Sequence, residues 1–162
     1  MPMVSAEGFY IPAGDGEPYP FGGGGVATFK DRGADTGGHL EITENTLPPG
    51  YPGTPAHIHN SLDHAWYVLD GVVGFEVGHR VVHAGRGACV FAPKGLAHRF
   101  FNPGSEPARW LQIDSIGGRE EMFKEMAERL PNDAPPDPVV MLEIFAKYDT
   151  RPTDVPMEDS DD

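Results

Sequence analysis

The chain has 162 residues and carries 25 acidic against 12 basic side chains, a formal net charge of −13. This length suits one domain with one hydrophobic core, and the charge argues against partners such as nucleic acid or an anionic membrane surface. No stretch reaches the ~20 apolar residues of a membrane span, and the N-terminus lacks a signal-peptide pattern, so we expect a cytoplasmic protein. The single cysteine, Cys89, cannot form an intramolecular disulfide, and its apolar flanks predict a buried structural thiol.

Residues 1–37 are rich in glycine, with four in a row at 22–25, and predict an irregular N-terminal arm with one strand near residues 26–30. Over residues 38–116, short runs of Val, Ile, Phe and Leu are separated by Gly and Pro turn signals. This pattern predicts an all-β sandwich or barrel of short strands.

Two helices are predicted over residues 117–150, packed on the barrel or on a partner subunit. The first places apolar side chains at positions 122, 123, 126, 127 and 130 on one helical face. The second has Asp137 as its capping residue and Pro138 at its first position. Residues 151–162 are acidic and predict a disordered tail.

Three histidines lie within eight positions, and a fourth follows later in the chain. His57 and His59 share one face of a short strand because side chains alternate along a strand. His64 begins the next strand, and His98 begins another just after a Pro-x-Gly turn. Adjacent strands of a barrel can bring such imidazoles to one point near its mouth, where they suit a transition metal.

These two stretches resemble the two motifs of the cupin superfamily. The first motif is Gly, a short gap, His-x-His, three or four residues, usually Glu, then six residues and Gly. Here it is matched by Gly50 or Gly53, His57, His59, His64 and Gly71. The second is matched without a gap by the following residues: Gly87, Pro93, Gly95, His98 and Asn102. The resemblance implies a cupin double-stranded β-helix, a jelly-roll barrel.

The chain departs from the family pattern at one position, because His64 stands where the motif usually has Glu. Carried over residue by residue, the resemblance implies one divalent transition metal ion held by His57, His59, His64 and His98. Imidazole ligands favour iron, nickel, copper or zinc over manganese. Trp66, Phe100 and Gln112 are candidates for the substrate pocket, although a structural role is the alternative for each.

The resemblance favours an oxygen-dependent dioxygenase that acts on a small organic molecule. Two alternatives stay open: a redox-neutral metal-dependent cyclase, lyase or isomerase, and a metal-binding cupin without turnover. We also expect a homodimer, because small cupins commonly pair through sheet edges. The remaining histidines match no motif and are expected to face solvent, namely His39, His79 and His83.

Overall fold

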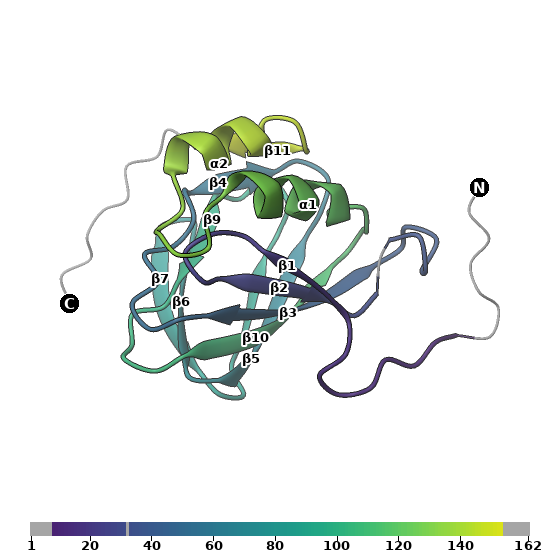
Figure 1. Cartoon of the computed structure of the whole chain (residues 1–162), viewed down its shortest axis with the longest axis horizontal. Coiled ribbons are helices and arrows are strands. Elements are labelled where there is room, and N and C mark those ends of the chain that lie inside the picture. Colours follow the sequence, from purple (N-terminus) through teal and green to yellow (C-terminus); the bar gives the residue numbers. More distant parts are fainter. Residues whose placement is uncertain (1–7, 32, 154–162) are drawn as a thin grey trace.

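The computed structural model describes residues 8–31 and 33–153. Within these ranges the chain forms short strands and two helices, which lie at one end of the molecule (Figure 1). In chain order the elements are β1 (Glu17–Pro20), β2 (Val26–Phe29), β3 (Glu41–Leu47), β4 (His57–His59), β5 (His64–Asp70), β6 (Val72–Val77), β7 (Arg80–Gly85), β8 (Cys89–Ala92), β9 (His98–Phe101), β10 (Ala108–Asp114), α1 (Glu120–Arg129), α2 (Pro138–Phe145) and β11 (Thr150–Pro152).

Two antiparallel sheets build the barrel. One has six strands in the order β1-β2-β3-β10-β5-β8, and the other has five in the order β11-β4-β9-β6-β7. Alternating side chains of both sheets point inward and form one core, in which Trp66, Phe75 and Trp110 are almost fully buried. The all-β jelly-roll prediction is therefore confirmed.

The glycine-rich N-terminal segment takes a larger part in the barrel than the sequence indicated. The predicted strand near residues 26–30 is present as β2, but β1 pairs with it, and this hairpin extends the larger sheet beside β3. Gly22, Gly23 and Gly24 all have positive φ and form the turn between the two strands. β1 has only four residues, two of them proline, so no strand could be predicted there from the sequence. Residues 1–7 of the predicted arm lie outside the described ranges.

Both predicted helices are present and pack on the barrel. The predicted apolar face of α1 is confirmed, since Met122, Phe123 and Met126 are buried. In α2 the Asp137 carboxylate accepts a hydrogen bond from Val139 N at 2.8 Å, the expected N-terminal cap. Among the described residues, no helix is long and apolar enough to cross a membrane.

The C-terminal segment corrects another expectation. Residues 150–152, of which the last two were assigned to the acidic tail, form strand β11 and pair with β4 at the edge of the smaller sheet. The rest of the predicted tail, residues 154–162, lies outside the described ranges.

Cys89 is exposed, so the prediction of a buried thiol was wrong. It lies on β8 opposite Tyr67 of β5, a position that faces away from the core, whereas Val90 lies opposite the buried Trp66. The apolar flanks of Cys89 therefore mark the inward face, and strand alternation places the thiol on the other face. His39, His79 and His83 are exposed, as expected.

Candidate metal centre

Strand register brings three predicted ligands together inside the barrel. His57 of β4 and His98 of β9 are direct cross-strand partners, and their ring centroids are 4.6 Å apart. His59 lies two residues along β4 on the same face. The three imidazoles are buried, and one nitrogen from each lies within 4.8 Å of the other two. The three nitrogens are therefore close enough together to be candidate ligands of one ion.

His64 completes a cluster of four rings. Its ring centroid lies 4.8 Å from that of His59 and 4.9 Å from that of His98, although its nitrogen falls outside the group of three. The ring stacks on Trp66, its neighbour on the inward face of β5. Asp63, the residue before it, instead accepts a hydrogen bond from Lys94 N and does not enter the cluster. The fourth position of the ligand set therefore stays a prediction.

Each imidazole is hydrogen-bonded through Nδ1, which leaves Nε2 as its metal-binding atom. His57 Nδ1 donates to Pro55 O at 2.8 Å, and His98 Nδ1 donates to Leu96 O at 2.9 Å. Both acceptors stand two residues before the histidine, at the entry to its strand. A backbone carbonyl cannot donate, so Nδ1 of each ring carries the proton and Nε2 presents a lone pair.

Strand β11 supplies the partner of His59. Thr150 lies directly opposite His59 in the sheet, and its Oγ1 is 3.0 Å from His59 Nδ1. The Thr150 hydroxyl donates to Tyr148 O at 2.9 Å, so its oxygen is left to accept the Nδ1 proton of His59. No sequence motif marked Thr150, because its role depends on the pairing of two short strands far apart in the chain.

A buried polar network holds His64. Its Nδ1 donates to Asp114, the residue directly opposite on β10, and the other carboxylate oxygen of Asp114 accepts from Arg119 at 2.8 Å. Gln112 donates to the same oxygen at 3.2 Å and accepts from Trp66 Nε1 at 2.8 Å. Gln112 thus links β10 to β5 through its hydrogen bond with Trp66.

Burial keeps the four imidazoles neutral. It lowers the pKa of His57 to about 3, and it also lowers the pKa of His59, His64 and His98. The nearby Arg119 guanidinium acts in the same direction. Burial alone would raise the pKa of Asp114, but the His64 imidazole and Arg119 outweigh it and lower this pKa. Neutral imidazole is the form that binds metal.

The cluster fits a metal ion. His59 Nε2 and His98 Nε2 are both buried and have no hydrogen-bond partner. Leaving a buried polar nitrogen unsatisfied costs about 1–3 kcal/mol, and an ion bound by both would remove that cost. Hydrogen-bonded Nδ1 atoms are the usual support for imidazole ligands.

A narrow apolar cavity of about 20 Å³ adjoins the cluster, between the barrel and the two helices. This volume holds about one water molecule, so a substrate needs movement of α1 or α2 to enter. Of the three predicted pocket residues, Phe100 lines this cavity, while Trp66 and Gln112 do not. Its lining is Phe21, Thr54, His57, Phe100, Arg119, Met122, Phe123, Met126, Met141 and Phe145.

Arg119 is the one charged side chain in this lining, and sequence reasoning missed it. Its side chain is 13% exposed, lies over the Phe123 ring and donates to Asp114 through Nη1. Its Nε is buried without a hydrogen-bond partner. It directly precedes α1, where the sequence shows only a glycine-rich connection, so no pattern placed it beside the histidines.

Comparisons with known proteins agree with this architecture. The family model described as "Cupin domain" matches residues 44–114. KdgF from Halomonas sp. has a TM-score of 0.61 at 16% identity, covering 71% of this chain and 98% of that one. A predicted oxalate decarboxylase from Thermotoga maritima has a TM-score of 0.61 at 18% identity, covering 67% of this chain and 99% of that one.

The polyketide cyclase RemF from Streptomyces resistomycificus has a TM-score of 0.57 at 23% identity, covering 65% of this chain and 78% of that one. A search of curated proteins finds no match. At these identities the solved structures show a shared fold and not a shared reaction. Residues 44–114 thus match a cupin domain, and the two sheets with their histidine-bearing strands agree with that match.

Proposed function

We propose that this protein is a metal-dependent enzyme that binds a small organic anion between the imidazole cluster and Arg119 and converts it without net oxidation. Isomerisation, elimination and ring closure are the reaction types in this class. The observation that carries the proposal is the mostly buried Arg119 guanidinium, which lines the same apolar cavity as His57.

Arg119 is suited to hold an anionic oxygen. One of its nitrogens is occupied by Asp114, but the buried Nε has no acceptor. A carboxylate, phenolate or enolate oxygen of the substrate would satisfy it with a charge-assisted hydrogen bond. The apolar walls exclude water, so that hydrogen bond is stronger than it would be in solvent. Asp114 in turn fixes the guanidinium in place.

A divalent ion held by the histidines would supply Lewis acidity to a substrate oxygen. The chain's own contribution is orientation: the four Nδ1 hydrogen bonds fix the rings, and Arg119 stabilises negative charge that develops on the substrate. Phe100 and Phe145, which line the cavity, would pack against the apolar part of the substrate.

The thioethers of Met122, Met126 and Met141 favour a redox-neutral reaction. All three line the cavity. Methionine beside an oxygen-activating centre is exposed to conversion to the polar sulfoxide, which would disrupt this packed wall. An oxygen-dependent dioxygenase is the second candidate, supported by imidazole ligands that suit iron and copper and by the same water-excluding walls.

Ligand binding tests the anion site. Benzoate titrated into the zinc-loaded protein should quench the fluorescence of the tryptophans. Arg119→Gln should lower the affinity for benzoate at least tenfold and leave the affinity for the uncharged benzamide unchanged. Arg109→Gln is the matched control, because Arg109 is a partly exposed arginine on the outer face of β10, paired with Asp70 and Glu44. Equal benzoate affinity in Arg119→Gln and the wild type would reject the site.

Oxygen dependence separates the two candidates. Small carboxylic acids and β-dicarbonyl compounds would be screened with protein loaded with zinc or with iron, in air and under argon. Turnover by the zinc form under argon supports the redox-neutral proposal. Turnover that needs both iron and oxygen supports the dioxygenase instead.

A further inference from the structure

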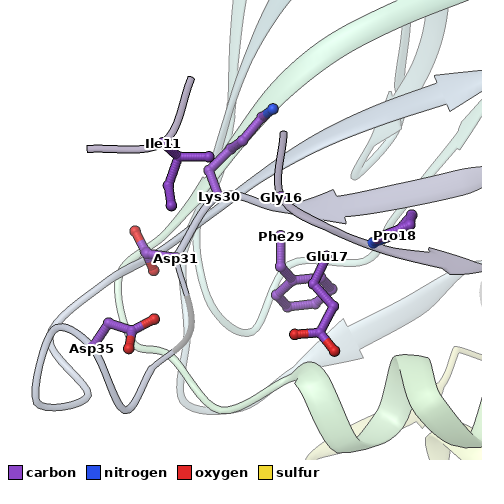
Figure 2. A pocket seen from close by; sticks show the side chains of 8 residues that line it. All are labelled: Ile11, Gly16, Glu17, Pro18, Phe29, Lys30, Asp31 and Asp35. Carbon is purple, nitrogen blue, oxygen red and sulfur yellow. The ribbon is translucent and has the colours of Figure 1, made fainter. Parts of the chain in front are cut away.

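Two cavities in the described part of the chain differ in what they offer a ligand. The larger one, about 400 Å³, lies beside the N-terminal hairpin, and the charged side chains that line it do not converge on one point (Figure 2). The cavity beside the histidines is narrower, but three polar side chains line it together: Thr54, His57 and Arg119. His57 and Arg119 have roles in the proposed function, whereas Thr54 has none there.

The Thr54 hydroxyl is buried without a partner. Thr54 is 5% exposed, and among the described residues none makes a hydrogen bond with its Oγ1. A threonine in a connecting segment commonly bonds its hydroxyl to the neighbouring backbone, and this one does not. A buried hydroxyl without a partner is unfavourable, and valine has nearly the same shape without that cost. Packing alone would therefore favour valine at this position.

The backbone holds Thr54 close to the histidines. The residue before it, Gly53, has a φ of +102°, and a Cβ there would lie only 2.7 Å from Phe100 O, so the chain approaches β9 closely. Thr54 N donates to the same carbonyl at 3.3 Å. Next along the chain, Pro55 O accepts the Nδ1 hydrogen bond of His57 at 2.8 Å. The short segment that orients the His57 ring therefore also places Thr54.

The two sides of this cavity come from different parts of the fold. Thr54, His57 and Phe100 belong to the barrel, whereas α1 and α2 contribute methionine and phenylalanine side chains. A substrate that enters by displacing a helix still meets the Thr54 hydroxyl on the barrel side. The aromatic rings and thioethers of the lining suit a flat apolar ring in the substrate.

We propose that Thr54 determines specificity at this site by hydrogen bonding to an uncharged hydroxyl group of the substrate. The substrate class is then a hydroxy acid with an apolar ring, in which Arg119 holds the anionic oxygen and Thr54 holds the hydroxyl. This inference rests on the proposed function. A site with a buried hydroxyl discriminates against a ligand that lacks the matching polar group, because the protein hydroxyl is then left unpaired.

Ligands with and without a hydroxyl test this contact. Calorimetric titration of the zinc-loaded protein compares benzoate with 3-hydroxybenzoate and 4-hydroxybenzoate. At least one hydroxylated ligand should bind about five- to tenfold more tightly than benzoate, as expected for one added hydrogen bond. This gain should vanish in Thr54→Val and persist in Thr54→Ser. Equal affinities for the three ligands in the wild type, or a gain that survives in Thr54→Val, would overturn the proposal.

Stability separates a ligand-binding role of Thr54 from a structural one. Without ligand, Thr54→Val should unfold at the same urea concentration as the wild type or at a higher one, because an unpaired buried hydroxyl is removed. Thr43→Val is the matched control, since Thr43 is 1% exposed, lies outside the cavity lining and accepts a hydrogen bond from Asn45 Nδ2 at 3.2 Å. It should lower the urea midpoint and leave the preference for hydroxylated ligands unchanged. A lower midpoint for Thr54→Val with an unchanged ligand preference would assign Thr54 a structural role instead.

Uncharged ligands separate this inference from the anion site. Benzamide and its 3- and 4-hydroxy derivatives carry no charge for Arg119 to hold, so the gain that depends on Thr54 should remain in Arg119→Gln. If Arg119→Gln binds benzoate like the wild type while that gain persists, the anion site fails and the Thr54 contact stands. If benzoate needs Arg119 but no hydroxylated ligand gains from Thr54, the proposed function stands and this inference fails. Absence of binding by every one of these ligands would overturn both.

Discussion

Replacing His64 by Glu restores the residue usual in the first cupin motif and tests why this chain differs. His64 is 2% exposed, Asp114 is 1% exposed, and the imidazole donates its Nδ1 proton to that carboxylate. Glutamate at position 64 would place a second carboxylate against Asp114 and remove its donor. We therefore expect His64→Glu to be destabilising by itself, and we infer that histidine at 64 and aspartate at 114 depend on each other.

The structure sets the size of the effect. An uncompensated buried charge typically costs 3–5 kcal/mol, and Arg119 still compensates Asp114, so about 3 kcal/mol is expected for the added carboxylate. With an m-value of about 2 kcal/mol/M, the urea midpoint of the metal-free protein should fall by about 1.5 M. The double variant His64→Glu/Asp114→Asn should recover about 2 kcal/mol, because the new amide can donate to the new carboxylate.

Urea unfolding at pH 7.5 of the four proteins in the cycle measures this coupling. His64→Gln is the matched control, because its neutral side chain keeps a donor for Asp114 and should lose much less stability. The inferred dependence of His64 on Asp114 is wrong if His64→Glu is as stable as the wild type, or if adding Asp114→Asn to it restores no stability. Histidine at position 64 would then be a neutral variation. The folded double variant should also bind manganese better relative to zinc, since an oxygen ligand replaces a nitrogen.

Three further predictions concern the support of the site, its pH response and the outer face of the barrel. Thr150→Val should lower zinc affinity about 10–100-fold in a chelator competition, because His59 Nδ1 loses its hydrogen-bond acceptor. Thr150→Ser keeps the hydroxyl and should retain the affinity. Equal zinc affinities of Thr150→Val and the wild type would contradict the assigned tautomer of His59. In the metal-free protein the free energy of unfolding should fall as the pH drops from about 6.5 toward 3, because the unfolded chain binds protons that the buried imidazoles, such as His57 with its pKa of about 3, do not bind. Each such imidazole costs about 1.4 kcal/mol per pH unit in that window, and a flat urea midpoint between pH 7 and 5 would contradict this. Neighbouring strands of the larger sheet expose three large apolar side chains, Tyr67, Phe91 and Ile113, so we expect a homodimer through this face. Light scattering should give twice the mass of one chain for the wild type and the mass of a single chain for Phe91→Glu.

The fold and the central histidines could be predicted from sequence because their signals are local. His57 and His59 are two residues apart on one strand, so alternation alone gives them a common face. Gly95 and Pro93 mark the turn before His98. The apolar spacing of α1 and the Asp137 cap of α2 are likewise contained within a few neighbouring residues, and each was found where the sequence indicated.

The residues that the sequence did not reveal act through pairings between distant strands. Thr150 supports His59 across 91 positions, and Asp114 holds His64 across 50. A threonine in a short C-terminal segment and an aspartate at the end of a strand are ordinary residues until the register places each opposite a histidine. Register depends on the whole sheet, because a slip of one residue would turn each side chain to the other face. The motif therefore supplies the imidazoles, whereas the pairing of β10 and β11 with the histidine strands decides which ring nitrogen of His64 and His59 is left free to bind a metal.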